Sequence, residues 1–459
     1  MSTHPTPLLD HQTIEHNFRE LEPALSDAEA ILESNRCLFC FDAPCTRACP
    51  THIDVPKFIK KIASGNLIGS ARTIFEANPI GASCARVCPV EALCVGACVE
   101  NALAHQPIMI GRLQRYATDA AMKTGRDLFK AGESNGKSVG IVGSGPAGIA
   151  CATYLARLGY DVTIYERRAL PGGLDTYGMA EYKMTQRVSL EEVQMIERLG
   201  VKILVNTEIG RDVSLADLES RHGAIFLGIG LGSTIKLGIP GEELPGVYEA
   251  LDFIERIKTR EWAHVPIGKT VAVIGAGNTA VDAATQAKRL GAEEVLMIYR
   301  RSEREMPAYS YEYELAKQDA IEFRWHTAPV EILANDDGTG VKAVLCVRTQ
   351  LGEPDEKGRR KFEFIPGTEF EIKADMVVKA LGQQKLVTFL SQIPGIELDE
   401  LGRIKVNPET KQTTNPKYFA GGDCVNGGRE AVDAAQAGKH AAQGIHELLS
   451  GEKVKFAGA

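Results

Sequence analysis

The chain has 459 residues, which at roughly 150 residues per domain suggests about three structural units, each able to bury its own core. Its 52 Lys and Arg against 60 Asp and Glu give a net charge of −8, which argues against a dedicated nucleic-acid binder, since such a protein presents a basic face. We find no export signal and no apolar run near about 18 residues, so neither secretion nor a membrane span is expected, and a cytoplasmic location is predicted.

Cysteine is crowded at one end of the chain. Of the 11 cysteines, eight lie between residues 37 and 98. A disulfide framework is typical of short exported chains, so bound metal is favoured here. The first four cysteines follow a C-x2-C-x4-C-x3-C-P pattern, related to a ferredoxin pattern in which the fourth cysteine serves the other cluster. These residues are Cys37, Cys40, Cys45 and Cys49.

A second group of cysteines can supply the ligands that the first group lacks. It comprises Cys84, Cys88, Cys94 and Cys98, and the two groups together would allow two four-iron clusters. Two closed zinc sites are the alternative, although two Cys-Pro steps and the x4 spacing favour clusters. With helices predicted over Val55–Ala63 and Leu67–Ala77, residues 1–130 are expected to form a small helical domain organised by its metal.

The next segment predicts a dinucleotide-binding unit. A buried strand, Ser138–Val142, leads into a G-x-G-x-x-G motif and then a helix over Ile149–Leu158. In that context the glycines let backbone N–H groups approach a pyrophosphate at the helix N-terminus. The next strand, Asp161–Tyr165, ends at Glu166, whose carboxylate can accept hydrogen bonds from a ribose diol. The motif residues are Gly143, Ser144, Gly145, Pro146, Ala147 and Gly148.

A second copy of this pattern begins at the strand Thr270–Ile274 and runs into a helix over Val281–Leu290. Its next strand ends not in an acid but in Arg300 and Arg301. Guanidinium groups there suit a 2′-phosphate, so NADPH is favoured over NADH. A solvated strand end is the alternative interpretation of the two arginines. The motif residues are Gly275, Gly277, Asn278, Thr279 and Ala280.

The C-terminal part returns to the first nucleotide site. A strand, Tyr418–Ala420, precedes Gly422 and Asp423, and a helix follows over Glu430–Leu449. Asp423 can hydrogen-bond the ribityl or pyrophosphate part of a flavin, although an Asp N-cap in a plain strand-turn-helix is the alternative.

The predicted fold class is therefore α/β, with two Rossmann-like domains preceded by the α-helical iron–sulfur domain. We expect the FAD domain over residues 131–235 and 374–459, interrupted by an inserted NAD(P) domain over residues 236–373.

Together these motifs resemble the pyridine nucleotide-disulfide oxidoreductase superfamily. Within it, the chain is most similar to the family of glutamate synthase small subunits and PreT-like electron-input subunits of dihydropyrimidine dehydrogenase. The segments Asn78–Pro89 and Ile110–Gln114 are most similar to the dihydropyrimidine dehydrogenase branch.

The resemblance implies specific ligands. It implies one [4Fe-4S] cluster on Cys37, Cys40, Cys45 and Cys98, and a second on Cys49, Cys88, Cys94 and the amide oxygen of Gln114, with Cys84 as a non-ligand. It implies FAD on the first glycine motif, Glu166, Gly173, Leu174, Gly422 and Asp423, and NAD(P)H on the second motif with Arg300 and Arg301. Lys183 stands where the family often has an arginine, and an ammonium cannot reproduce a planar fork.

A nicotinamide delivers two electrons as a hydride, whereas an iron–sulfur cluster accepts one, so the flavin is the adapter in a path from NAD(P)H through FAD to two clusters. No acid–base catalyst is assigned, since hydride transfer is governed by stacking and distance.

No residues remain for a substrate domain. The resemblance therefore implies a PreA-like partner subunit that carries FMN in a TIM barrel, forms a heterotetramer with this chain and reduces uracil or thymine to 5,6-dihydropyrimidines. The alternatives are a glutamate synthase small subunit and, outside the enzymes, a zinc-stapled nucleotide-binding scaffold.

Overall fold

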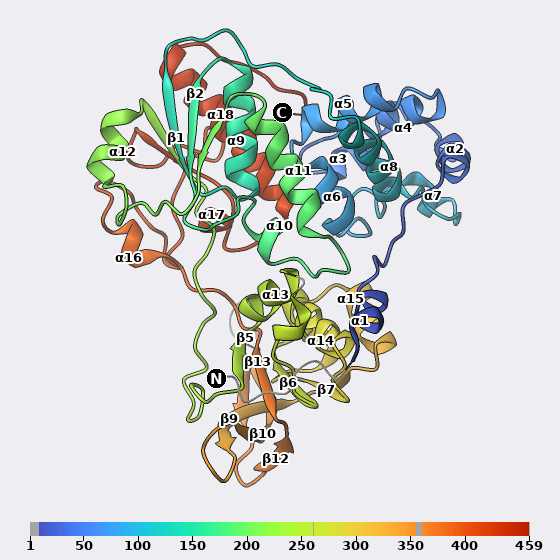
Figure 1. Ribbon diagram of the computed structural model, residues 1–459, viewed down its shortest axis with the longest axis vertical. Helices are drawn as coiled ribbons and strands as arrows, with labels where there is room; N and C mark the ends of the chain where they lie inside the picture. The colour runs from blue at the N-terminus through green and yellow to red at the C-terminus, as the bar shows by residue number, and fades with distance from the viewer. Residues whose placement is uncertain (1–8, 260, 355–359, 459) are drawn as a thin grey trace. The chain divides into compact units, whose positions relative to one another are not determined.

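The computed structural model describes residues 9–259, 261–354 and 360–458 (Figure 1). The chain divides into two compact units. Unit 1 contains the segments Met1–Glu20, Tyr177–Tyr182 and Ser233–Gln384, and unit 2 contains Leu21–Thr176, Lys183–Gly232 and Lys385–Ala459. Most of the predicted iron–sulfur and FAD segments thus share unit 2, whereas the NAD(P) segment lies in unit 1. Residues 374–384, which we predicted as part of the FAD domain, lie in unit 1, because the strand over 376–379 pairs within its sheet.

The N-terminal part of unit 2 is helical, and both helices predicted there have the predicted bounds. The N-terminus of α4 is capped by the side chain of Asp54, which accepts from Lys57 N at 3.1 Å, and Asn66 caps α5 in the same way. The helices are α2 (Asp27–Arg36), α3 (Pro44–Ala48), α4 (Val55–Ala63), α5 (Leu67–Ala77), α6 (Gly81–Val87), α7 (Val99–Ala102) and α8 (Ile110–Lys123).

The rest of unit 2 is built on a five-stranded parallel sheet in the order β14-β4-β1-β2-β3. The strands are β1 (Ser138–Val142), β2 (Asp161–Tyr165), β3 (Lys202–Leu204), β4 (Ala224–Leu227) and β14 (Tyr418–Ala420). Because β1 lies between β2 and β4, the strand order reverses there, and parallel sheets bind ligands at the carboxyl ends of strands at such a point.

The helices of this part flank the sheet, and α9 packs against α18 (Figure 1). They are α9 (Pro146–Arg157), α10 (Leu174–Tyr177), α11 (Gln186–Glu197), α12 (Leu215–Arg221), α16 (Val387–Leu390), α17 (Asp423–Asn426) and α18 (Ala431–Ser450). The helix α9 begins three residues before the predicted start, because Pro146 sits in the first turn, where its fixed φ fits and no N–H is needed. Its N-terminus therefore lies inside the glycine motif.

One hydrophobic core joins the iron–sulfur and FAD segments of unit 2. It includes Phe58, Ile59 and Leu113 from the helical part together with Ile141 and Ile149 from the sheet part. A polar contact reinforces it, since the buried Tyr154 hydroxyl on α9 donates to the Glu76 and Ala77 carbonyls at 2.9 Å each.

Unit 1 contains a second five-stranded parallel sheet, in the order β5-β13-β6-β7-β8, and an antiparallel sheet of β9 to β12. The parallel strands are β5 (Val247–Glu249), β6 (Thr270–Ile274), β7 (Glu294–Ile298), β8 (Glu322–Arg324) and β13 (Met376–Lys379); the antiparallel ones are β9 (Thr327–Ala334), β10 (Val341–Pro354), β11 (Arg360–Phe364) and β12 (Phe370–Lys373). The helices are α1 (His11–Asn17), α13 (Ala250–Lys258), α14 (Asn278–Arg289) and α15 (Ser310–Gln318), with short 3-10 turns at Trp262–His264 and Glu303–Glu305.

The N-terminal helix α1, which we grouped with the iron–sulfur domain from the sequence, is part of unit 1. Phe18 stacks on the buried Trp262 ring with centroids 5.4 Å apart, and Asn17 and Arg289 exchange two hydrogen bonds at 3.0 and 2.9 Å. In the described part of the chain, no helix is both long enough and apolar enough to cross a membrane.

Candidate functional site

Ser144 and Glu166 order the first glycine motif. One oxygen of the buried Glu166 carboxylate accepts from the Ser144 backbone N–H at 3.0 Å and from its hydroxyl at 2.6 Å, while the other accepts from Arg168 N at 2.8 Å. Gly172 N in turn donates to the Ser144 hydroxyl oxygen at 3.1 Å. Glu166, which we predicted to bind a ribose, therefore also ties the first glycine motif to the end of β2, and Ser144 ties the motif to the loop before α10.

The three predicted FAD segments converge at the N-terminus of α9. A Cβ placed on Gly173 would lie 2.6 Å from Gly145 Cα, so these loops touch and tolerate no side chain there. A Cβ on Gly422 would lie 3.2 Å from the Ala147 Cβ, which brings the C-terminal segment to the first turn of α9. The structure thus brings together residues from the first motif, Gly173-Leu174 and Gly422-Asp423.

Asp423 begins the short helix α17. Its carboxylate accepts from Arg429 N at 3.2 Å, and burial raises the pKa of its carboxyl group. Lys183, the predicted substitute for an arginine near the flavin, is half-buried at the start of a unit 2 segment.

These residues fit an FAD. A Cβ at Gly145 would meet nothing closer than Gly173 Cα at 3.9 Å, so the backbone is open at the point where a pyrophosphate approaches. No side chain caps the N-terminus of α9, which leaves its first N–H groups for an anion.

The second glycine motif has the same construction within unit 1. It follows β6, which lies between β7 and β13, and it leads into α14, whose N-terminus has no side-chain cap. A Cβ on Gly277 would meet no atom within 4 Å. The Asn278 side chain is not free to cap, because its oxygen accepts from Tyr309 N at 3.0 Å. Thr279 and the fully buried Ala280 continue the first turn.

Arg300 and Arg301 follow β7 as predicted, and they differ in environment. The exposed Arg300 guanidinium lies over the Phe362 ring, 4.4 Å from its centroid, and its carbonyl accepts from the Thr349 hydroxyl at 2.8 Å. The buried Nε of Arg301 has no hydrogen-bond partner among the described residues. A cationic side chain with an unused donor fits an anionic ligand such as a 2′-phosphate.

The predicted ligands of the first cluster line one cavity. About 360 Å³ of empty space is surrounded by all four thiols together with apolar side chains that include Val55, Ile59 and Ile110. Burial raises the pKa of the Cys37 thiol, and it raises that of Cys45 to about 11. A thiol loses its proton when it ligates a metal, so these four side chains fit a ligand that supplies compensating positive charge, as iron does. The four thiols are those of Cys37, Cys40, Cys45 and Cys98.

In the second predicted set, Cys88 lies close enough to Cys49 and Cys94 to interact with them electrostatically, and Gln114 lies on α8, which packs against α6. Cys88 is the C-cap of α6, and burial raises the pKa of the nearby Cys94 thiol. Gln114 is buried on α8, where its amide nitrogen donates to Gly81 O at 2.7 Å, an orientation that leaves the amide oxygen for another partner. Cys49, the remaining predicted member, has its sulfur 3.3 Å from the Thr51 hydroxyl.

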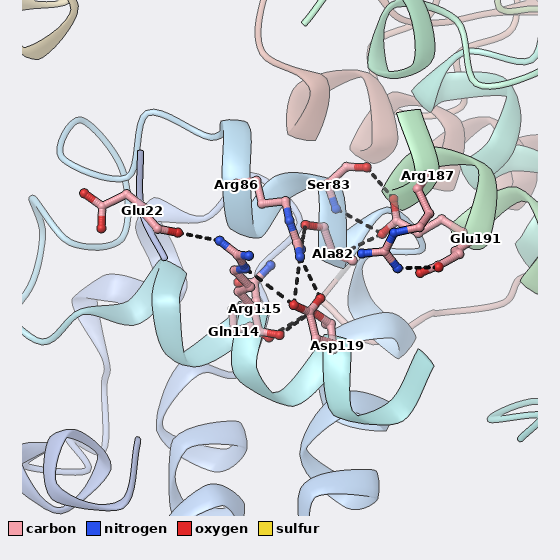
Figure 2. Close-up of polar contacts among 11 residues, drawn as sticks. Glu22, Ala82, Ser83, Arg86, Gln114, Arg115, Asp119, Arg187 and Glu191 are labelled. Atoms are coloured by element: carbon pink, nitrogen blue, oxygen red, sulfur yellow. Dashed lines mark hydrogen bonds and ion pairs between the residues drawn. The ribbon is translucent and has the colours of Figure 1, made fainter. Parts of the chain in front are cut away.

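Cys84 is engaged by its own neighbours. Asn78 Nδ2 donates to its sulfur at 3.1 Å, and the residue is buried on α6. One ion pair joins α6 to α8, as Figure 2 shows: Arg86 donates to both oxygens of Asp119 at 2.8 Å. Within α8, Arg115 also donates to Asp119 at 3.4 Å. Among the described residues, no three Cys, His, Asp or Glu side chains converge on one point as a single-ion site requires.

Two buried charged residues near these sites were missed by the sequence analysis. Lys439 on α18 donates to Thr51 O at 3.1 Å and Ala457 O at 2.9 Å, and burial lowers the pKa of its amine to about 7. Glu192 on α11 binds the start of α6. The available signal was their position: each occupies an apolar face of a helix, as Glu192 does between Val188 and Ile196.

Two family models match the chain. One, described as dihydropyrimidine dehydrogenase domain II, 4Fe-4S cluster, matches residues 14–126, and the other, described as pyridine nucleotide-disulphide oxidoreductase, matches residues 137–438. The chain is 37% identical to the glutamate synthase [NADPH] small chain of Escherichia coli (strain K12) over 447 residues, 94% of each protein. It is 35% identical over 432 residues to the NAD-dependent dihydropyrimidine dehydrogenase subunit PreT of the same organism, covering 94% of this chain and 97% of the relative.

Solved structures agree on the fold. FprA from Mycobacterium tuberculosis in complex with NADPH aligns with a TM-score of 0.56 at 22% identity, covering 69% of this chain and 86% of that one. Thioredoxin reductase from T. acidophilum aligns with a TM-score of 0.52 at 21% identity, covering 68% and 98%. The predicted fold class, family resemblance and cofactor types are confirmed: the protein is an oxidoreductase with a 4Fe-4S domain, FAD and a nicotinamide nucleotide as its redox partners.

Proposed function

We propose that this chain, which belongs to the pyridine nucleotide-disulphide oxidoreductase family, is an electron-input subunit that passes electrons from NAD(P)H through FAD and two [4Fe-4S] clusters to a partner that reduces uracil or thymine. The observation that supports electron input is the common core of unit 2. The thiol-lined cavity and the flavin loops belong to one compact unit, which suits electron transfer because its rate depends on fixed spacing.

The residues of the chain have separable roles in this function. Bound FAD takes two electrons together from a nicotinamide and gives them up singly, which lets it supply one-electron clusters. Glu166 and Ser144 fix the loop that binds its pyrophosphate, and the N–H groups at the start of α9 donate to that anion. Arg300 and Arg301 bind the 2′-phosphate of NADPH. The ligand thiols, of which those of Cys49 and Cys98 are buried and the others partly buried, would hold the iron.

The dihydropyrimidine assignment rests on the second cluster. Gln114 is buried with its amide oriented by Gly81 O, as an oxygen ligand would require. The match of residues 14–126 to a dihydropyrimidine dehydrogenase domain supports the same branch. The partner in this proposal is a PreA-like TIM-barrel subunit that carries FMN, in a heterotetramer with this chain. Cys49, Cys88 and Cys94 complete the ligand set.

A second candidate is the small subunit of glutamate synthase. Two observations favour it: the chain is 37% identical to an NADPH-dependent small chain, and it carries the arginine pair that suits NADPH. The two candidates share the electron path and differ in the partner.

The test begins with anaerobic purification and analysis of iron, sulfide, zinc and flavin on one sample. About eight irons and one FAD, bleached by NADPH, are expected. Zinc without flavin would overturn the electron-input function. The loaded protein is then mixed with an FMN-containing TIM-barrel subunit or with a glutamate synthase large subunit. Uracil-dependent oxidation of NAD(P)H in the first mixture supports the dihydropyrimidine assignment. Glutamine-dependent oxidation of NAD(P)H in the second mixture instead assigns the chain to glutamate synthase.

A further inference from the structure

Glu192 links the FAD part of unit 2 to the helix that carries Cys84 and ends at Cys88. Its carboxylate, only 2% exposed, accepts from Ala82 N at 2.6 Å, Ser83 N at 3.2 Å and the Ser83 hydroxyl at 2.5 Å. Figure 2 shows Ala82 and Ser83 directed toward α11. None of these partners is a cation, so the buried carboxylate is solvated by dipoles alone in the described structure.

A cavity that Glu192 helps to line also has exposed residues on its wall. About 390 Å³ of empty space is lined by Glu192, by apolar side chains such as Leu128 and Phe129, and by Asp127 and Arg198. Asp127 and Arg198 pair at 2.9 Å, and their side chains are 59% and 39% exposed. The cavity therefore gives a proton a route between solvent and the residue that carries the buried carboxylate.

On balance, burial and a neighbouring carboxylate oppose the ionised form of Glu192. Burial, the largest cause, and the charge of Asp175 on α10 raise the pKa of its carboxyl group to about 8, although the bonds from Ser83 and Ala82 act to lower it. On α6, the buried thiol of Cys84 lies beside it, and α9 contributes the uncharged Thr153 to the cavity wall. On α11 itself, Glu191 is turned to Arg187, which it bonds at 2.6 Å.

We propose that Glu192 is a redox-linked proton acceptor: when one electron reduces the cluster at Cys88, one proton from solvent binds the Glu192 carboxylate, and it leaves when the electron moves on. The proposal rests on the proposed function, because Cys88 is assigned there as a ligand. The electron comes from NAD(P)H through FAD, and the proton comes from water through the cavity, so charge and atoms balance.

The length of α6 sets the size of the effect. From Ala82 to Cys88 the helix rises roughly 9 Å, and the Glu192 carboxylate lies a hydrogen bond before Ala82, so roughly 10 Å separates it from Cys88. One added negative charge at about that distance, at an effective dielectric constant of about 20, strengthens proton binding roughly tenfold. A tenfold change corresponds to about 59 mV for a one-electron couple, so the midpoint potential is expected to fall by about that much from acid to alkaline pH.

The experiment is an anaerobic redox titration of the full holoenzyme, followed by electron paramagnetic resonance, over a pH range centred near 8. We expect one cluster of the wild type to show the fall in potential, Glu192→Gln to remove it and Glu191→Gln to keep it. In Glu192→Gln, the amide that replaces the carboxylate retains an oxygen acceptor for Ala82 and Ser83. Glu191 is the matched control, since it is the adjacent carboxylate but is 32% exposed and paired.

The possible results distinguish a failure of this inference from a failure of the proposed function. A fall in potential that persists in Glu192→Gln, or none in the wild type, overturns this inference while the cluster signals leave the proposed function standing. Absence of any cluster signal overturns the proposed function and this inference with it. Should Glu192→Gln fail to fold, the infrared difference spectrum of the wild type decides: reduction must produce the C=O band of a protonated carboxylic acid.

Discussion

Replacement of Glu166 by alanine tests how the flavin site is built. The change removes the acceptor of three hydrogen bonds, from Ser144 N, the Ser144 hydroxyl and Arg168 N. Because the carboxylate is only 6% exposed, the abandoned donors cannot all be hydrated. At about 1.5 kcal/mol for each bond to a charged acceptor, the low end of the usual range, the free energy of unfolding of unit 2 is expected to fall by about 4–5 kcal/mol.

The assay is the release of FAD during urea unfolding, followed by flavin fluorescence. A loss of about 4–5 kcal/mol moves the midpoint of release down by roughly 1.5 M urea for a unit of this size. Glu166→Gln keeps one oxygen acceptor and is expected to lose less. Glu208→Ala is the control, because that carboxylate is 39% exposed and pairs only at the surface with Arg211, where truncation costs little. Equal midpoints for Glu166→Ala and Glu208→Ala would refute the reasoning.

Four further outcomes are expected. Arg300→Ala weakens NADPH binding by about 1–2 kcal/mol, or roughly 5- to 30-fold, and leaves NADH binding nearly unchanged, whereas Arg304→Ala affects neither; equal losses for both nucleotides in titrations would show that Arg300 does not contact the 2′-phosphate. Cys45→Ala lowers the iron content from about eight to about four atoms per chain, and full retention would exclude Cys45 as a ligand. Gln114→Ala changes the resonance spectrum of one cluster and spares the other; unchanged spectra would return Cys84 to candidacy. At a pH below 7, where the Lys439 amine is mostly charged, Lys439→Met lowers the midpoint potential of the cluster near Cys49, because a buried positive charge that favours the added electron is removed; an unchanged potential would contradict this.

The nucleotide folds could be predicted from the sequence because their signals are local. Strands such as Ser138–Val142 and Thr270–Ile274 are short apolar runs followed at once by glycines, and the structure gives them the predicted bounds. The helix starts were predicted three residues late, because the first turn lies inside the motif and carries no apolar periodicity.

The contacts that were not predicted are all between distant residues. Glu192 meets Ala82 across 110 positions, and Arg300 lies over Phe362 only after β11 folds back on β10. A single glutamate on an apolar helix face indicates that its carboxylate has a buried polar partner, but the sequence does not identify that partner. The resemblance alone suggested Gln114 as a ligand, since an amide has no distinctive spacing in sequence.

The division of the chain agrees with the demands of the chemistry. A nicotinamide nucleotide must bind and leave in every turnover, which suits a domain with a core of its own. Transfer from flavin to cluster instead requires a constant distance. The iron–sulfur helices and the FAD sheet meet that demand by sharing one core. The Tyr154 hydroxyl strengthens it by donating to two carbonyls at the end of α5. Glu192 meets the same demand for a constant distance. A proton acceptor can respond to the charge of the cluster only where the spacing between α11 and α6 is fixed.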